Sequence, residues 1–196
     1  MLPIQFALFL ILLHNSPSNT ILTQKTLAAD SMNTPNTQLT QINKLAQYNH
    51  WANQEFIQWL EQADSAQWIR FVESSFSSLE LTVRHLWNAE SGWLSTLQKE
   101  PWKVAVDKES TLSQSEVLQG FRKTSEDFLN FVESMTVSQL LETRNIGKNE
   151  KPISLADIIQ HVYNHATFHR GQLVTIGRQT GMKNPPRTDY IYYMTR

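Results

Sequence analysis

Apolar residues recur at intervals of three and four along most of the chain after residue 37, which is the pattern of amphipathic helices. We predict four helices: over about residues 38–63, from the Ser-x-x-Glu sequence at 77–80 to about residue 98, from a second Ser-x-x-Glu at 113–116 to about residue 135, and from near Ser154 to just before Gly181. Both Ser-x-x-Glu sequences have the spacing of a capping box. No strand-like alternation of useful length is present, so the chain is expected to be all-α and to form a four-helix bundle.

The first 37 residues have a different character and are expected to form an extension ahead of a bundle domain at 38–196. Residues 16–37 are rich in Ser, Thr, Asn and Pro and read as disordered or as a short helical extension. The apolar run at 4–13 is too short to span a bilayer and lacks the basic residues that open a signal peptide. We therefore favour Met32 as the true start and a cytoplasmic location; export is the alternative, if residues 1–29 act as a signal peptide.

The amino-acid composition excludes several kinds of partner and chemistry. The chain is 40% hydrophobic over 196 residues, which suffices for one sizeable core. Its 17 Lys and Arg are balanced by 18 Asp and Glu, and no basic run interleaves with aromatic residues, so nucleic acid is not an expected partner. The absence of cysteine excludes disulfides, thiolate metal ligands and a cysteine nucleophile.

Three histidines lie at four-residue steps in the last predicted helix: His161, His165 and His169. An i, i+4 step advances about 6 Å along a helix, so neighbouring imidazoles can converge on one ion, whereas residues eight apart are separated by about 12 Å. At most one adjacent pair can chelate. His169 lies roughly 30° from the centre of the apolar face, His165 roughly 70° and His161 roughly 110°. The inward pair, His165 and His169, is therefore the predicted metal-binding pair, with two hydrogen-bonded core histidines as the alternative.

A site between helices needs a ligand from a second helix, and His85 is the candidate. It lies in a row of small residues on the second predicted helix, which leaves space beside that helix. The same row is equally consistent with a solvent-facing surface, so helical phase alone leaves both readings open. His50 falls about 90° from the apolar face of the first helix and is expected at the surface.

The chain also resembles a known family, the damage-inducible DinB-like proteins of the DinB/YfiT superfamily, and the resemblance implies a metalloenzyme. The resemblance covers about residues 40–196 and rests on four segments: Tyr-Asn-His-Trp-Ala-Asn at 48–53, Ser-Phe at 75–76 followed by His85, Glu90 and Trp-Leu at 93–94, Asn-His-Ala-Thr-Phe-His-Arg-Gly-Gln at 164–172, and Thr-Asp-Tyr-Ile-Tyr-Tyr at 188–193. It implies a divalent ion held by one histidine of the second helix and a His-x-x-x-His pair of the fourth, which are His85, His165 and His169 here.

A three-histidine ion with an open position implies a metal-dependent enzyme. Neutral ligands leave the ion its full charge, so a bound water becomes acidic, with a pKa of about 7 in known sites. The same ion can activate a thiol, which must come from a low-molecular-weight cosubstrate because the chain has no cysteine. We expect a hydrolase or a thiol transferase acting on a small molecule. Zinc or nickel fits the ligands best, and iron, cobalt or manganese also fits. A non-catalytic, metal-stabilised bundle with a stress-response role is the alternative, and an apo binding module is a third.

Further polar residues near these histidines are candidates to hydrogen-bond the imidazoles, although a purely structural bond is the alternative for each of them. They are Asn49, Asn53, Glu90 and His161. Arg170 is a candidate contact for an anionic group of the substrate, with an ion pair as the alternative. Gly171 is expected to allow close helix packing.

Several aromatic residues are expected to be exposed. Trp51 lies opposite the apolar face of the first helix, and Trp102, Tyr192 and Tyr193 lie outside the predicted helices. Such rings suit either a homodimer surface or a cover over a pocket.

Overall fold

The computed structural model describes the backbone of residues 17–196 and the side chains from residue 37 onward. The apolar run at 4–13, considered above as part of a signal peptide, lies outside the described residues. The chain divides into two compact units, one up to Thr37 and one over Gln38–Arg196, and the second holds the bundle. Residues 17–37 belong to helix α1 (Pro17–Leu60), which agrees with the helical alternative for the extension and not with the disordered one. Once a helix is nucleated, each further residue adds one hydrogen bond, which lets residues of modest propensity extend it.

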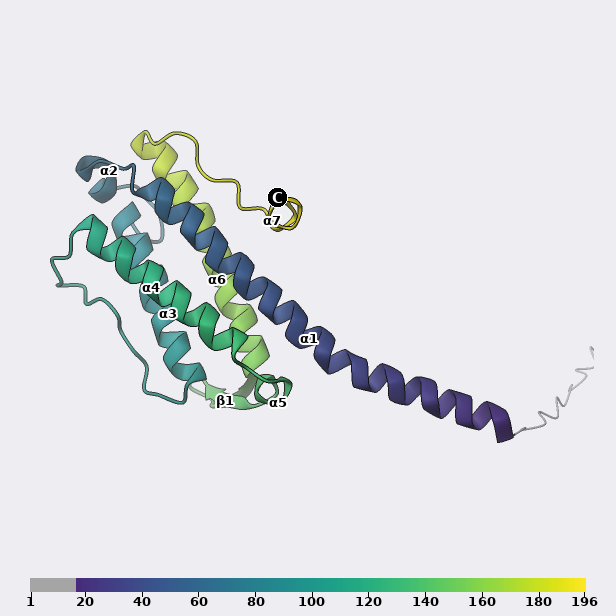
Figure 1. The fold of residues 1–196 in the computed structure, drawn as a ribbon. Helices are drawn as coiled ribbons and strands as arrows, with labels where there is room; N and C mark the ends of the chain where they lie inside the picture. The colour runs from purple at the N-terminus through teal and green to yellow at the C-terminus, as the bar shows by residue number, and fades with distance from the viewer. Residues whose placement is uncertain (1–16) are drawn as a thin grey trace, which may run out of the picture. The chain divides into compact units, whose positions relative to one another are not determined.

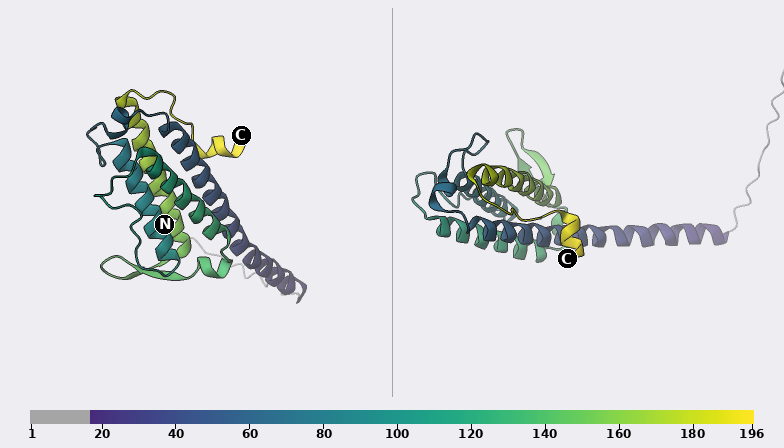
Figure 2. Two further views of the ribbon diagram at one scale, coloured as in Figure 1. Left: turned by 60° about the vertical axis from the view of Figure 1, so that its left-hand side comes forward. Right: turned by 90° about the horizontal axis from the view of Figure 1, so that it is seen from above.

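Four long helices form the bundle, as the periodicity predicted (Figure 1). They are α1, α3 (Leu79–Leu97), α4 (Gln114–Glu133) and α6 (Leu155–Thr180). Helix α3 packs against both α4 and α6, and the views of Figure 2 agree that these helices lie side by side. The predicted four-helix bundle is therefore confirmed.

Local hydrogen bonds explain where these helices begin and end. The capping box of α4 is present, because Ser113 and Glu116 each accept a hydrogen bond from the other's backbone N–H. Helix α6 is capped by Ser154 and ends at Gly181, whose φ of 97° favours glycine. The capping box predicted at 77–80 is wrong by one residue, since Ser78 caps α3 and accepts from the backbone of Leu81.

Five shorter elements were not predicted. They are α2 (Ser65–Ile69), α5 (Val137–Leu140), β1 (Thr143–Ile146), β2 (Lys151–Ser154) and α7 (Tyr190–Thr195). The strands pair antiparallel, with Thr143 opposite Ser154 and Ile146 opposite Lys151, so the expectation of a purely helical chain is wrong at this hairpin. Strands of four residues carry too little alternation to be recognised against helical periodicity.

The core is split by a layer of polar side chains. One apolar cluster includes Phe56 of α1, Leu86 of α3 and Phe121 of α4, and the other includes Ala46 of α1 and Phe128 of α4. Between the clusters, the same helices bury polar residues: Asn49 and Asn53 on α1, Glu90 on α3 and Ser125 on α4. The bundle therefore has two hydrophobic halves with a hydrogen-bonded layer between them.

The expected exposure of the aromatic residues is only partly correct. Trp51 is half-buried, because Tyr193 of α7 lies against it with ring centroids 5.2 Å apart. Tyr192 and Tyr193 both belong to α7, which was not predicted; Tyr192 is 42% exposed, as expected, whereas Tyr193 is half-buried. Trp102 is 53% exposed but packs edge-on against Trp93.

None of the helices in the described part of the chain, residues 17–196, combines the length and hydropathy that a bilayer crossing requires. The expected absence of a stable membrane span agrees with this finding for those residues.

Two glycines of α6 give a matched test of packing. A Cβ at Gly177 would lie 2.3 Å from the ring of Trp59, whereas a Cβ at Gly171 would meet no atom within 4 Å. The expectation that Gly171 allows close packing is therefore wrong, and Gly177 has that role.

We expect Gly177→Ala to lower the free energy of unfolding by about 1–3 kcal/mol through overpacking. Gly171→Ala should raise it by up to about 1 kcal/mol through helix propensity. Urea denaturation of both variants measures this, and equal effects would contradict the packing explanation.

Candidate metal centre

Helices α3 and α6 bring three imidazoles together. His85 projects from α3, and His165 and His169 project from successive turns of α6. The Nε2 atom of His85 lies 2.9 Å from that of His165 and 3.1 Å from that of His169, and the two α6 nitrogens are 3.1 Å apart. His85 and His165 are half-buried, and His169 is buried. Of the two readings left open for His85, the structure shows the one that faces the α6 pair.

Hydrogen bonding among the imidazoles alone cannot satisfy this triangle. In a neutral imidazole each Nε2 offers either one hydrogen or one lone pair. Three such atoms cannot make three mutual hydrogen bonds, so at least one pair must set lone pair against lone pair or hydrogen against hydrogen. A cation shared by three lone pairs removes this conflict. The nitrogens are also close enough for one ion to reach all three at the usual distance of about 2.0–2.1 Å.

The protonation states of the histidines suit such an ion. Burial lowers the pKa of His85 to about 4, with a further contribution from the nearby His169. Burial, and then the neighbouring histidines, lower the pKa of His165 to about 4. Burial also lowers the pKa of His169. The rings are therefore neutral near pH 7, and neutral imidazole is the form that binds metal ions.

One side of the triangle is held by residues to which the sequence assigned no role. Gln172 lies three residues after His169 on the same helical face, and its Oε1 accepts from Nδ1 of His169 at 2.7 Å. Its Nε2 donates in turn to Ser75 at 3.1 Å. The neighbouring Phe76 stacks on His85, with ring centroids 4.0 Å apart. A proton on Nδ1 leaves the Nε2 lone pair of His169 directed at the other two histidines.

Three of the four residues that were candidates to hydrogen-bond the imidazoles belong instead to a separate network. Glu90 Oε1 accepts from Asn49 at 3.0 Å and from Asn53 at 2.9 Å. Both asparagines accept from Nη1 of Arg170 at 2.7 Å. Asn53 also donates to Ser125 of α4 at 3.1 Å. This buried network connects all four bundle helices and contains one acid and one base.

The remaining residues that the sequence analysis considered for the site lie outside the histidine triangle. His161 is exposed, and its ring lies 5.0 Å from that of Trp93 and 5.9 Å from that of His165, so it lies beside the triangle. Arg170 is buried, also donates to Thr167 at 2.9 Å, and lines a cavity of about 730 Å³ that the three histidines do not line. The expectation that His50 lies at the surface is wrong, because it is half-buried and its Nδ1 lies 3.3 Å from the hydroxyl of Ser125.

A second cavity adjoins His85, whereas His165 and His169 do not line it. It has a volume of about 460 Å³ and is lined by His85 and Phe76 together with residues of two loops. Small-molecule sites in proteins commonly have this size. One imidazole of the triangle, that of His85, thus forms part of the wall of a cavity of small-molecule size.

The part of the chain that holds the bundle and the three histidines is similar to known proteins. The DinB family model matches residues 32–196, which include the four-helix unit and all three histidines. The chain belongs to the DinB family. Protein DinB of Bacillus subtilis (strain 168) is 26% identical over 159 residues, which cover 77% of this chain and 92% of that protein. The resemblance inferred from the sequence motifs is thereby confirmed.

A solved structure shares the fold of this DinB family protein. YfiT from Bacillus subtilis, described as a probable metal-dependent hydrolase with an unusual four-helix bundle topology, has a TM-score of 0.61 and is 14% identical. The match covers 74% of this chain and 90% of that chain. At this identity the likeness concerns the fold.

The bond from His169 to Gln172 predicts a tautomer. In chelator-treated wild-type protein at neutral pH, we expect His169 to carry its proton on Nδ1, because Gln172 Oε1 can only accept. Gln172→Leu removes the acceptor and should raise the Nε2–H population, whereas Gln172→Glu keeps an acceptor and serves as the control. Imidazole ¹⁵N chemical shifts report the tautomer, and an unchanged tautomer in Gln172→Leu would contradict this orienting role.

Glu90 predicts a pH dependence of stability. Burial raises the pKa of Glu90, and this effect exceeds the opposing bonds from Asn49 and Asn53 and the charge of Arg170. Between the unfolded and folded pKa values, the folded protein therefore binds more protons, and stability falls as pH rises through this interval. We expect Glu90→Gln to lack this decrease.

Urea denaturation of wild type and Glu90→Gln over about pH 5–8 measures the effect, because contributions of the histidines are common to both proteins and cancel in the difference. Glu126→Gln, which changes an exposed carboxylate of α4, is the matched control and should keep the wild-type slope. Parallel slopes for wild type and Glu90→Gln would show that the burial of Glu90 does not perturb its ionisation.

Proposed function

We propose that this protein is a metal-dependent enzyme in which His85, His165 and His169 hold one divalent ion. The observation that supports this most directly is the convergence of three neutral Nε2 atoms, from two helices, within 3.1 Å of one another. Structural zinc sites are usually completed by four protein ligands, whereas catalytic zinc sites have three and an open position. Among the described residues the cluster consists of these three histidines, which favours the open type.

The ligand set indicates the kind of chemistry. Three imidazoles add no negative charge, so a bound ion would act as a strong Lewis acid that makes a water molecule or a thiol more acidic. The protein holds the imidazoles in place: Gln172 fixes the ring of His169, and Phe76 packs against that of His85. The adjoining cavity of about 460 Å³ provides space for a small-molecule substrate. Zinc or nickel suits these ligands best, with iron, cobalt or manganese as further candidates.

Hydrolysis and thiol transfer are the two reaction types that this site supports. The fold shared with YfiT, described as a probable metal-dependent hydrolase, favours hydrolysis. A thiol would have to be a separate low-molecular-weight cosubstrate, since the chain has no cysteine. A homodimer, a cytoplasmic location and a role in the damage response stay predictions.

Metal content and turnover, measured on the same variants, test this proposal. Protein purified without an affinity tag should contain about one divalent ion per chain, and His165→Ala should lose it. His161→Ala is the matched control, because it removes an exposed histidine one turn away and should keep the ion. Esters, amides, and electrophiles offered with small thiols serve as substrates. Turnover should fall to background in His85→Ala and persist in His161→Ala.

Two outcomes would argue against the proposal in different ways. Equal metal content in wild type and His165→Ala would exclude His165 as a required ligand. Metal that binds to the wild type and raises its melting temperature, without turnover of any substrate class, would favour the non-catalytic reading, in which the ion links α3 to α6.

A further inference from the structure

We propose that the cavity beside His85 binds an uncharged, apolar group, either aromatic or branched aliphatic. This inference extends the proposed function, because the group would belong to the substrate of the metal site. The cavity lies between one face of α3 and two loops, those that contain Phe76 and Val106. Its chemistry is decided by which lining atoms remain free to contact a ligand.

Helix α3 supplies one wall with four residues at spacings of three and four. They are Leu81, Arg84, His85 and Asn88. Such spacing places all four on the same face of the helix. Two of them are strongly polar, so residue types alone would suggest a site for a charged or hydrogen-bonding ligand. Their hydrogen bonds show that they serve the protein instead.

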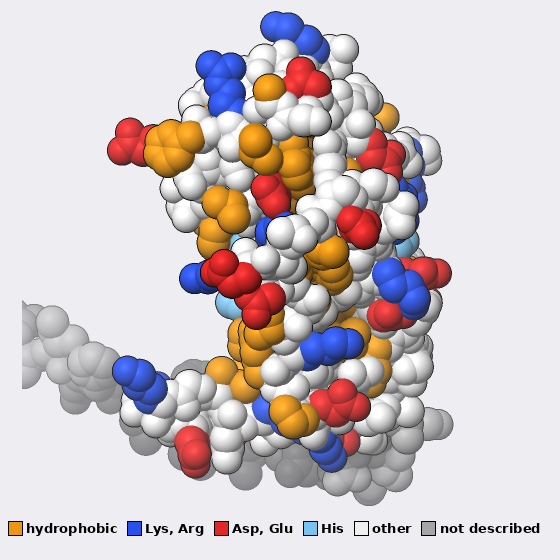
Figure 3. Space-filling view, turned by 90° about the vertical axis from the view of Figure 1, so that its left-hand side faces the viewer, with side chains coloured by type: hydrophobic (Ala, Val, Ile, Leu, Met, Phe, Trp, Pro, Cys, Tyr) orange, Lys and Arg blue, Asp and Glu red, His pale blue; other side chains and the backbone are white. Residues whose placement is uncertain are grey.

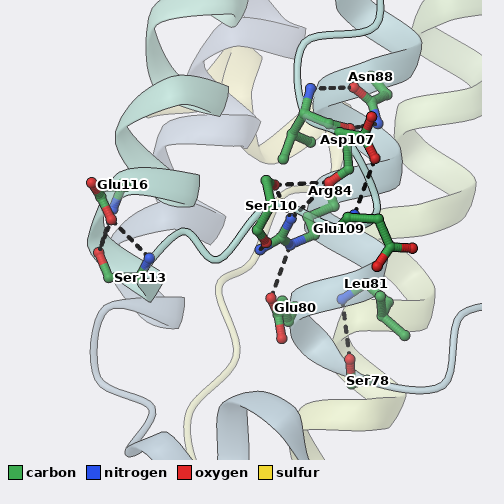
Figure 4. A network of polar contacts seen from close by, with 11 residues as sticks. Ser78, Glu80, Leu81, Arg84, Asn88, Asp107, Glu109, Ser110, Ser113 and Glu116 are labelled. Atoms are coloured by element: carbon green, nitrogen blue, oxygen red, sulfur yellow. Dashed lines mark hydrogen bonds and ion pairs between the residues drawn. The ribbon is translucent and has the colours of Figure 1, made fainter.

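Arg84 donates most of its hydrogen bonds to the loop that forms the opposite wall of the cavity (Figure 4). Its Nε donates to Glu80 at 2.9 Å, which neutralises its charge. Its Nη1 donates to the hydroxyl of Ser110 at 2.8 Å and to the carbonyl oxygen of Asp107 at 3.3 Å, and its Nη2 donates to the carbonyl oxygen of Ser110 at 3.1 Å. Four of its five N–H groups therefore have protein partners, and the side chain is 9% exposed.

Asn88 holds the same loop one turn further along α3. Its Oδ1 accepts from the backbone N–H groups of Ala105 and Val106, both at 2.8 Å. Its Nδ2 donates to the carbonyl oxygen of Val106 at 2.8 Å. On the other loop, the hydroxyl of Ser75 accepts from Gln172. Arg84 and Asn88 thus hold the walls in place and have little hydrogen-bonding capacity left for a ligand.

Leu81 and Phe76 form an apolar part of the cavity wall. Leu81 is 45% exposed, and Phe76 presents its ring while stacking on His85. Exposed Asp107 and Lys108 also line the cavity, and because their charges are opposite they give it no net charge. On the face that Figure 3 shows, hydrophobic side chains reach the surface between acidic and basic ones, and histidine side chains reach it as well. A charged group placed against Leu81 and Phe76 would lose its hydration without gaining a partner there, whereas an apolar group gains burial.

Ligand binding to metal-free wild-type protein tests this inference. The probes share one ring and differ in charge: benzyl alcohol, benzoate and benzylammonium. We expect benzyl alcohol to shift the methyl NMR signals of Leu81 and Val106, and each charged probe to bind about tenfold more weakly or worse. Leu81→Trp should fill the cavity and weaken benzyl alcohol binding at least about tenfold. Leu141→Trp, the same change at a leucine that is 64% exposed and does not line this cavity, should leave it unchanged.

Failure of this inference can be told apart from failure of the metal proposal. Benzohydroxamic acid carries the same ring and a metal-chelating group, so metal loading should tighten its binding about tenfold or more while leaving benzyl alcohol unaffected. Binding of benzyl alcohol without this gain would support the apolar cavity and count against the metal centre. No binding of the neutral probe, equal binding of the charged probes, or unchanged binding in a folded Leu81→Trp variant would overturn the inference.

Discussion

The buried network in which Asn49 and Asn53 connect Glu90 to Arg170 is the constraint that the rest of the structure depends on. An acid and a base in a hydrophobic core are tolerated only where their partners meet, because an unpaired buried charge costs several kcal/mol. The network therefore selects one axial register of α1, α3 and α6. Glu90 lies five residues after His85, and Arg170 directly follows His169. The register that satisfies the network thus also places His85 opposite the α6 histidines.

Most of the bundle and part of the site follow from sequence because they depend on local periodicity. Four long helices, the cap at Ser113 and the inward direction of His165 and His169 are set by residues within one helix. The position of His85 is not, since its row of small residues suits a solvent-facing or a site-facing helix equally, and only family resemblance favoured the site. Which side is correct depends on the register between helices, and that register is fixed by contacts that are distant in sequence.

The errors have the same origin. The two glycines of α6 have the same residue type on one helix, yet only Gly177 has a tryptophan ring against it. The short hairpin and α7 are each stabilised by what they pack on: α7, for example, lies on Trp51, which periodicity alone assigned to the surface. Likewise Asn49, Asn53 and Glu90 were predicted as candidates to hydrogen-bond the imidazoles, but the sequence could not tell whether they bond to imidazoles or to each other.

The surroundings of His169 and of His85 differ in how their polar side chains are used. Towards Gln172 and Ser75, hydrogen bonds hold the ring of His169, and this arrangement fixes a lone pair. Towards Arg84 and Asn88, equally polar side chains hold a loop in place, and Leu81 and Phe76 form an apolar surface beside His85. An ion bound here would therefore meet its substrate in a cavity that offers few competing hydrogen bonds. In such surroundings the ion itself would be the strongest polar contact for the substrate, so the reactive polar group would be directed to it while the apolar group occupies the cavity.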